Sequence, residues 1–261
     1  MRRIKTNNKH AIYMSLNKPK SNTQLMTIKN LTDKSADLYI YGEIVDNTDW
    51  KWDEADVMPD DVLNALNQVE GLESINLYIN SPGGSVFAGL AIYNMLKRNK
   101  AHKKAYIDGI GASMASIIPF AADEVYIPSN AFLMIHKPWV FSMGNSNDLR
   151  KTADDLDSIE SGLVKIYEDH LKDGVKIETI EKMMAEETWL NGEEAAKYFN
   201  VNVIEAKNIA ACSSEILERY EKTPHKLLAP VKNKQDSTNE PPINESIDKI
   251  KFQNELDLLE L

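Results

Sequence analysis

Short apolar runs alternate with segments of helical periodicity along most of the chain. The run INLYI at residues 75–79 is of the kind that parallel sheets bury on both faces. In the helical segments, apolar residues recur every three or four positions, as they do after Pro59, a residue that favours the first turn of a helix. Such alternation is typical of βαβ units, so we expect an α/β fold with a mostly parallel sheet and right-handed crossovers. The pattern predicts strands at residues 38–44, 75–79, 104–107, 124–127 and 131–135, and helices at 59–69, 85–97, 113–122, 147–171, 177–186 and 193–199.

The longest of these helices, at residues 147–171, carries many charges besides its apolar residues. It is too long and too charged to be wholly buried in one small domain. Two interpretations stay open: a solvated surface helix, and an extended helix that interdigitates with a partner subunit. The apolar residues on one side of it are Leu149, Leu156, Ile159, Leu163 and Ile166.

The two ends of the chain differ in composition from its middle. Residues 1–35 are rich in Lys and Asn and show no clear period, so they are expected to be a flexible leader. From residue 223 onward Pro, Asn, Lys and Ser dominate, which is the composition of a linker, and the last residues are acidic with several leucines. The predicted organisation is a leader at 1–35, one domain at 36–222, and a linker with an acidic tail at 223–261.

Composition excludes several classes of protein. A net charge of −10 and a pI near 5.1 argue against a nucleic-acid surface, which needs a basic stripe. The single cysteine, Cys212, rules out an intrachain disulfide and suits a reducing cytoplasm. No apolar core follows the basic N-terminus, and no uncharged run reaches the roughly 20 residues of a membrane span, so neither a signal peptide nor a membrane partner is expected.

Candidate chemistry lies in the stretch DGIGASMASIIPFAAD, residues 108–123, where a predicted strand turns into a predicted helix. Ser113 would stand at the start of that helix, where backbone N–H groups lack helical partners and negative charge is favoured. Ser113 is therefore either an ordinary helix cap or a nucleophile, and Ser116, one turn later, is a second candidate nucleophile.

A glycine turn and a histidine accompany this serine. Gly83 and Gly84 follow the strand at 75–79 and let the backbone approach a ligand, unless SPGG is an ordinary turn. The backbone N–H groups of Gly84 and Met114 would then form a two-donor oxyanion hole. His136 follows the apolar strand at 131–135, where it is either a structural residue or a general base.

These motifs resemble a known family. The segments INSPGGSVFAGLAIYNML, GASMAS, LMIHKPW and ETWLNGEEAAKYF, in this order and at these distances, are similar to the Clp-type serine peptidases with the ClpP/crotonase-like fold. The MIHKPW, ETWL and long-helix features resemble more closely the bacteriophage branch of head-maturation (prohead) proteases. The resemblance covers roughly residues 36–205 and implies a spiral of repeated ββα/βαβ units with a long protruding helix.

The resemblance also implies a Ser-His-acid serine endopeptidase. Ser113 falls on the family's nucleophile, His136 on its base, and Gly84 and Met114 on its oxyanion donors. The family's aspartate aligns with Glu187, which is one methylene longer, and Glu186 is the neighbouring alternative. The strand near 75–80 and the segment 137–145 would hold the substrate as an added β-strand, with Gly83 and Pro138 as the substrate-binding residues.

The resemblance further implies a ring-shaped homo-oligomer that acts on polypeptides and needs neither a metal nor a cofactor. Two roles compete: a phage protease that trims capsid and scaffold proteins in the host cytoplasm, and a Clp proteolytic subunit fed by an ATP-dependent AAA+ unfoldase. Two other classes stay open, a crotonase-like CoA enzyme and a non-catalytic capsid-assembly protein. The CoA enzyme would need other catalytic groups in place of Ser113 and His136.

Overall fold

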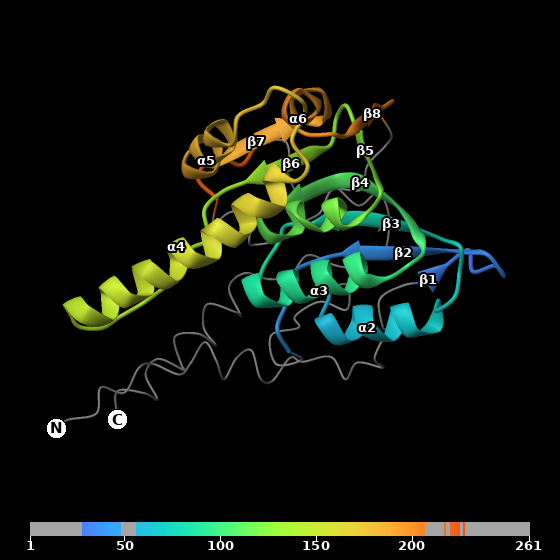
Figure 1. Ribbon diagram of the computed structural model, residues 1–261, viewed down its shortest axis with the longest axis horizontal. Coiled ribbons are helices and arrows are strands. Elements are labelled where there is room, and N and C mark those ends of the chain that lie inside the picture. The colour runs from blue at the N-terminus through green and yellow to red at the C-terminus, as the bar shows by residue number, and fades with distance from the viewer. Residues whose placement is uncertain (1–27, 48–55, 207–216, 218–219, 225–226, 228–261) are drawn as a thin grey trace, which may run out of the picture. The chain divides into compact units, whose positions relative to one another are not determined.

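A central sheet of mostly parallel strands, with helices packed beside it, forms the protein (Figure 1). The computed structural model describes residues 28–47, 56–206, 217, 220–224 and 227. The predicted linker and tail therefore lie almost wholly outside the described residues, and so does most of the predicted leader. In order along the chain the strands are β1 (Ile28–Lys29), β2 (Ser35–Tyr41), β3 (Ser74–Ser81), β4 (His102–Ala112), β5 (Glu124–Pro128), β6 (Phe132–Ile135), β7 (Thr188–Asn191) and β8 (Asn202–Ile204).

The sheet has the order β1-β2-β3-β4-β5-β8, with β6 paired to β4 and β7 paired to β6. All of these pairs are parallel except β1 with β2 and β6 with β7. The expected α/β class with a mostly parallel sheet is thus confirmed. The strands β1, β7 and β8 were not predicted, because each is only two to four residues long and carries little periodic signal.

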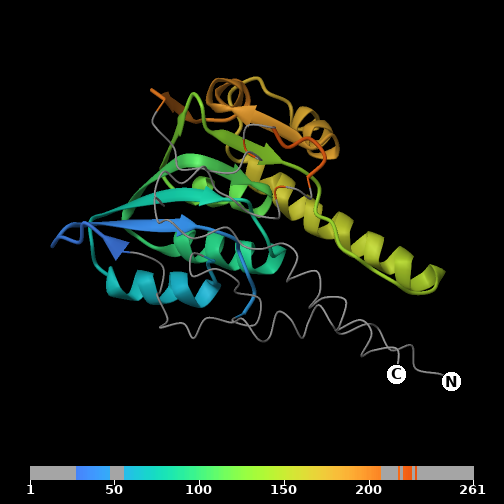
Figure 2. The same cartoon turned by 180° about the vertical axis from the view of Figure 1, so that it is seen from behind.

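Five α-helices connect or flank these strands within the described residues. In both views α2 and α3 lie next to each other along β2 and β3, whereas α5 and α6 gather with β7 at the opposite end (Figures 1 and 2). The long helix, α4, spans 23 residues, but only Leu163 and Tyr167 in its last third are buried. The five helices are α2 (Pro59–Gln68), α3 (Val86–Arg98), α4 (Ser146–Glu168), α5 (Ile177–Ala185) and α6 (Gly192–Tyr198).

The segment predicted as a helix at 113–122 is not an α-helix. It consists of two short 3-10 helices, Ser113–Ser116 and Ile118–Ala121. Pro119 lies in the first turn of the second one, and because proline has no backbone N–H, it cannot continue an α-helical ladder. The backbone of residues 113–121 is therefore wound more tightly than the α-helix that the apolar pattern predicted.

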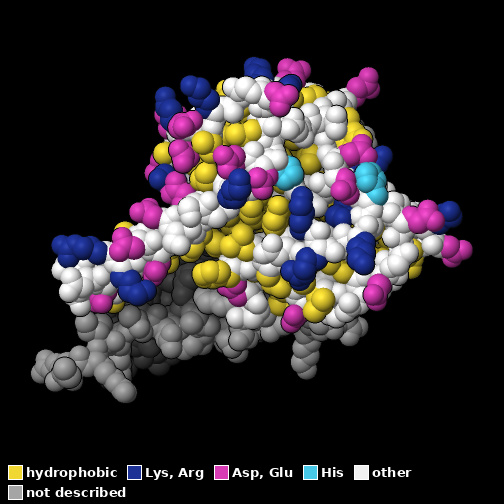
Figure 3. All heavy atoms as spheres, viewed as in Figure 1, with side chains coloured by type: hydrophobic (Ala, Val, Ile, Leu, Met, Phe, Trp, Pro, Cys, Tyr) yellow, Lys and Arg dark blue, Asp and Glu magenta, His cyan; other side chains and the backbone are white. Residues whose placement is uncertain are grey.

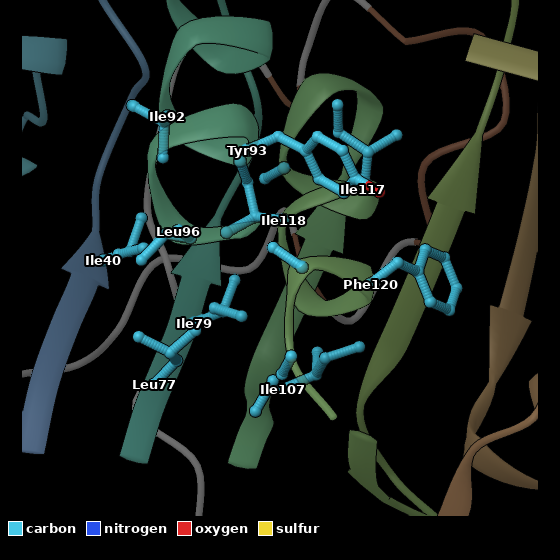
Figure 4. Packing of buried hydrophobic residues seen from close by; sticks show 14 of the residues in the cluster. Ile40, Leu77, Ile79, Ile92, Tyr93, Leu96, Ile107, Ile117, Ile118 and Phe120 are labelled. Atoms are coloured by element: carbon cyan, nitrogen blue, oxygen red, sulfur yellow. The ribbon is translucent and has the colours of Figure 1, made fainter. Parts of the chain in front are cut away.

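The hydrophobic core lies between the sheet, α3 and the two 3-10 helices. Figure 4 shows side chains of α3 meeting those of β2, β3 and β4, with Phe120 at the far edge. Leu77, Ile79 and Ile107 are almost completely buried there. The labelled residues of this layer are Ile40, Leu77, Ile79, Ile92, Tyr93, Leu96, Ile107, Ile117, Ile118 and Phe120.

Over residues 75–79 the strand β3 is fully buried on one face only, which corrects the expectation that both faces are buried. Ile75, Leu77 and Ile79 point into the core, whereas Asn76 and Tyr78 on the other face are only partly buried. On that second face a row of stacked tyrosines crosses four strands, with ring centroids 4.8, 5.2 and 5.0 Å apart. The row consists of Tyr39, Tyr78, Tyr106 and Tyr126.

None of the helices in the described part of the chain is both long enough and apolar enough to cross a membrane.

Candidate active site

Three neighbouring strands, β3, β4 and β6, end at the same edge of the sheet. Their parallel register pairs Ser81 with Gly111 and Ala112 with Met134. The residues that follow these strands therefore come together, and the carboxyl ends of parallel strands are where α/β proteins bind ligands.

Ser113 occupies a strained turn directly after β4. Its φ of 53° lies in the left-handed region, which costs a non-glycine residue about 1–3 kcal/mol. The preceding residue, Ala112, is extended, and a 3-10 helix begins at Ser113 itself, so Ser113 is not the cap of a helix. A serine on a strained strand-to-helix turn presents its hydroxyl to a cavity, as nucleophilic serines do on other α/β folds.

Ser116 supports this turn from behind. Its hydroxyl donates to the backbone carbonyl of Ser113 at 2.5 Å and lies 2.6 Å from the hydroxyl of Tyr167. Ser116 has no exposed surface. Both contacts hold the Ser116 hydroxyl inside the protein, so this residue is not placed to attack a substrate.

His136 lies directly against Ser113. The Nε2 atom of His136 and the Oγ atom of Ser113 are 2.6 Å apart, which is a short hydrogen bond. Burial lowers the pKa of the His136 imidazole, and the negative charge of Glu187 opposes this shift only in part. The imidazole is therefore neutral near pH 7, and a neutral imidazole can accept the proton of a serine hydroxyl.

Glu187 is brought close to His136 by strand pairing. The antiparallel register of β6 and β7 pairs Ile135 with Thr188, so the next step places His136 opposite Glu187. Like Ser113, Glu187 has a left-handed backbone, with φ 48°. Glu186, the alternative acid, is exposed and extends toward Lys182 on α5, with 3.9 Å between the charged atoms.

The Glu187 carboxylate is held by a distant part of the chain. It accepts hydrogen bonds from the backbone N–H groups of Glu221 at 2.9 Å and Lys222 at 2.7 Å, and from Nε1 of Trp189 at 3.3 Å. Among the described residues no hydrogen bond joins Glu187 to His136, so the two side chains interact only through the charge of the carboxylate.

Gly83 lies against the turn that carries Ser113, and Gly84 follows Gly83 in the chain. A Cβ atom on Gly83 would lie 2.6 Å from the carbonyl oxygen of Ala112 and 2.8 Å from the Cβ of Ser113. A Cβ atom on Gly84 would lie 2.1 Å from the carbonyl oxygen of Ile44. Both residues have positive φ values, 96° and 142°. Only glycine fits at either position, and this lets the SPGG turn lie directly against Ser113.

The backbone N–H groups of Gly84 and Met114 take no part in the hydrogen bonds of the neighbouring β-bridge and 3-10 helix. The bridge between Ile44 and Gly84 uses the carbonyl of Gly83 and the N–H of Ser85, and leaves the N–H of Gly84 outside this pair of bonds. Met114 is the second residue of a 3-10 helix, a position whose N–H has no partner within the helix. Both residues line the same cavity as Ser113.

This cavity has a volume of about 220 Å³ and is lined by both Ser113 and His136. Pro138, a predicted substrate-binding residue, is among the residues that line the cavity, whereas Gly83 and Glu187 are not. The lining residues of the described chain are Glu43, Gly84, Ser85, Val86, Ser113, Met114, His136, Pro138, Trp139, Leu163, Tyr167 and Tyr220. In the described ranges no three His, Cys, Asp or Glu side chains come together as a metal site would require.

Tyr220 is a residue of the site that sequence reasoning missed. Its ring meets the His136 ring edge to face, with centroids 5.2 Å apart, and its hydroxyl donates to the carbonyl of Pro82 at 2.7 Å. The one signal in the sequence for this contact is the spacing of Leu217 and Tyr220. Side chains three positions apart lie on the same face of a helical turn, so both could pack against the sheet. Both are buried against the sheet residues Ile110, Ala112, Phe132 and Met134.

The family of the chain follows from a comparison of its sequence with models of known protein families. Residues 20–228 match the model of the Clp protease family, and this range contains every residue of the site described above. The match spans well over half of the 261 residues. The mixed α/β fold with its central sheet fits such a protease, and the chain belongs to the Clp protease family.

Proposed function

We propose that this Clp protease hydrolyses peptide bonds by a Ser-His-acid mechanism in which Ser113 is the nucleophile. The observation that carries the proposal is the 2.6 Å contact between the Ser113 hydroxyl and His136 Nε2. Both residues line a cavity that Gly84 and Met114 also line. A crotonase-like CoA enzyme would need other groups at these two positions, so the serine and histidine favour the peptidase.

In the first half of the reaction, Ser113 Oγ attacks the carbonyl carbon of the scissile bond and its proton passes to His136 Nε2. The oxyanion accepts hydrogen bonds from the N–H groups of Gly84 and Met114; losing one such donor typically costs about 2.7–4 kcal/mol of transition-state stabilisation. When the C–N bond breaks, His136 returns the proton to the leaving amine. Water then hydrolyses the ester on Ser113 in the same way, with His136 again as the base.

Glu187 completes the group as the acid that orients the imidazole. An ionised carboxylate offers about four acceptor sites, and the three donors seen here leave one for the Nδ1–H of His136. The attraction that Glu187 already exerts on the charged imidazole supports this role.

The substrate is a polypeptide, as it is for Clp proteases in general. We propose that the segment 137–145 and the strand end near residue 80 receive it as an added β-strand. The exposed hydrophobic side chains after His136 support this, since each is at least half exposed: Trp139, Val140, Phe141 and Met143. Figure 3 shows hydrophobic side chains gathered on the face between α4 and α3.

Clp proteases typically form oligomeric rings, and we propose that this chain forms one in which α4 protrudes and meshes with another copy. The exposed apolar residue Leu149, 46 % exposed near the start of α4, supports a contact of this kind. Sedimentation of the wild type and of Leu149→Glu tests it, because a charge in the contact should shift the protein toward smaller species.

The biological role that the MIHKPW and ETWL motifs favour is that of a phage head-maturation protease acting on capsid or scaffold proteins in the host cytoplasm. A Clp subunit fed by an AAA+ unfoldase is the second candidate, and the Clp family match favours it equally. Neighbouring genes for portal and capsid proteins would favour the first role, and a neighbouring unfoldase gene the second.

Labelling with a fluorophosphonate tests the proposed chemistry directly, because only an activated serine reacts. We expect the wild type to be labelled, with the adduct located at Ser113 by mass spectrometry, and Ser113→Ala and His136→Ala to remain unlabelled. A labelled Ser113→Ala variant would refute the assignment, as would cleavage of a peptide by that variant at the wild-type rate.

A further inference from the structure

A turn formed by Tyr220, Glu221 and Lys222 reaches the active site from a part of the chain that no site motif covers. The carboxylate of Glu187, 35 residues before Lys222, accepts the backbone N–H of Lys222 at 2.7 Å. The N–H of Glu221 bonds to the other carboxylate oxygen at 2.9 Å. The side chain of Lys222 in addition donates to the carbonyl of Glu186. The turn therefore grips both the side chain of Glu187 and the backbone beside it.

The same turn touches the other two parts of the site through Tyr220. The Tyr220 ring stands at 79° to the His136 ring and covers it edge to face. The Tyr220 hydroxyl bonds to the carbonyl of Pro82, directly before the glycine pair that faces Ser113. One side chain thus joins the imidazole to the SPGG turn.

The turn is itself firmly anchored. Tyr220 is 8 % exposed and Leu217 is 1 % exposed, and both pack against β4 and β6, the strands that lead to Ser113 and His136. The hydroxyl of Thr223 closes the segment by donating to the carbonyl of Leu217 at 2.6 Å. An anchored turn of this kind can hold the groups that it contacts.

We infer that the turn Tyr220–Lys222 is a positioning element of the catalytic centre, in which two backbone N–H groups fix the Glu187 carboxylate while Tyr220 fixes the His136 ring and the SPGG turn. The inference rests on the proposed function of Ser113, His136 and Glu187. A glutamate needs such support more than an aspartate would, because its extra methylene adds a rotatable bond whose freedom must be lost when the side chain is fixed. None of the three residues of the turn reacts with the substrate.

The test compares Tyr220→Phe and Tyr220→Ala in the full-length protein. The first keeps the ring over His136 and loses the bond to Pro82, whereas the second loses both contacts. The measured quantity is the second-order rate constant for fluorophosphonate labelling, recorded as a function of pH. Tyr106→Phe is the matched control, since Tyr106 lies in the outer tyrosine row and no hydrogen bond of its hydroxyl occurs among the described residues.

We expect Tyr220→Phe to slow labelling by about 3- to 10-fold, the effect of one hydrogen bond, and Tyr220→Ala by about 10²-fold, the effect of a misplaced reacting group. Tyr220→Ala should also move the acid limb of the pH profile upward, because it removes part of the apolar cover of His136. Tyr106→Phe should match the wild type in both respects. A purely structural role of Tyr220 would lower thermal stability without moving that limb.

A double variant shows whether the turn acts through the acid. If it does, Tyr220→Ala slows labelling less in a Glu187→Gln background than in the wild type, because coupled residues are not additive. If the effects of Tyr220→Ala and Glu187→Gln on the labelling rate are fully additive, the turn does not act through Glu187.

Two results would overturn the inference as a whole. One is wild-type labelling by Tyr220→Ala with an unchanged acid limb, and the other is faster labelling, which would make the turn an inhibitory cover. If Tyr220→Ala does not fold, Tyr220→Phe decides, and an unchanged rate counts against the inference. An unreactive wild type would instead refute the proposed function, and the inference with it.

Discussion

The hydroxyl oxygen of Ser113 lies 2.6 Å from Nε2 of His136, although the two residues are 23 positions apart in the chain. The parallel pairing of β4 with β6 produces this contact, since Ala112 and Met134 are partners and the two side chains follow directly after them. The proton acceptor is therefore in place before any substrate binds. Proton transfer from Ser113 depends on that contact and on the neutral state of the imidazole.

The pH dependence of peptide hydrolysis should reflect His136. Burial lowers the pKa of this imidazole below its usual value of 6.5. A general base must be neutral, so kcat/KM should be constant near pH 7 and fall as the pH drops through the lowered pKa. The measurement is the pH profile of kcat/KM for a fluorogenic peptide. An acid limb above the ordinary histidine range would contradict the assignment.

Glu187→Gln should move that limb further down. The carboxylate raises the pKa of His136 by stabilising the charged imidazole, and glutamine cannot replace this attraction. The plateau rate should also fall, by about 10²- to 10⁴-fold, because the imidazole loses the group that orients it. The same pH profile measures both effects. An unchanged limb together with an unchanged plateau would exclude Glu187 as the acid.

The core beneath the site should tolerate little loss of volume. Leu77 on β3 has no exposed surface and packs between the sheet and α3 (Figure 4), so Leu77→Ala should cost about 2–5 kcal/mol of unfolding free energy. Leu63 on α2 is 45 % exposed, and Leu63→Ala should change stability by no more than about 0.5 kcal/mol. Urea denaturation of the two variants measures the difference. Equal losses would mean that Leu77 is not part of a tightly packed core.

The periodic elements could be predicted from the sequence because their signal is local. Strand β3, with its apolar residues at 75, 77 and 79, and helix α3 were found within one or two residues of their observed bounds. The parallel arrangement followed from their alternation. What could not be predicted was which face of β3 stays partly open, since Tyr78 belongs to a row whose members come from four strands.

In the active site, too, some features could be predicted from the sequence and others could not. Ser113, His136 and Gly84 each follow a recognisable strand, so their meeting at one edge of the sheet could be expected. The left-handed backbone of Ser113 could not, because its local pattern also suits a helix start. Tyr220 lay furthest from prediction: its contacts with His136 and Pro82 depend on a chain return that no local periodicity records.

Gly83→Ala should abolish labelling of Ser113. A methyl group at this position would lie 2.8 Å from the Cβ of Ser113 and 2.6 Å from the carbonyl of Ala112, so the strained turn must shift. Since a misplaced nucleophile loses its alignment with the oxyanion donors, we expect a loss of more than about 10²-fold in labelling rate. The measurement is fluorophosphonate labelling, with circular dichroism as a check on folding.

Gly71→Ala is the control for backbone strain alone. Gly71 has a similar positive φ, 84°, but nothing lies within 4 Å of the position that a Cβ would take. The free energy of unfolding of this variant should fall by about 1–2 kcal/mol, the penalty of a left-handed alanine, and its labelling rate should equal that of the wild type. Equal labelling by both variants would show that Gly83 is not held against Ser113.

Ser116→Ala should weaken the fold while leaving the nucleophile in place. The variant removes the donor to the Ser113 carbonyl and the partner of the Tyr167 hydroxyl. Burial raises the pKa of Tyr167 to about 12, so this hydroxyl stays neutral and becomes a buried polar group without its partner, at a cost of about 1–3 kcal/mol. Ser161→Ala is the matched control, because Ser161 donates to the carbonyl three residues earlier in the same way but is exposed. We expect a lower melting temperature for Ser116→Ala only, with the fluorophosphonate adduct still at Ser113. Loss of the adduct in a folded Ser116→Ala protein would instead give Ser116 a direct part in the chemistry.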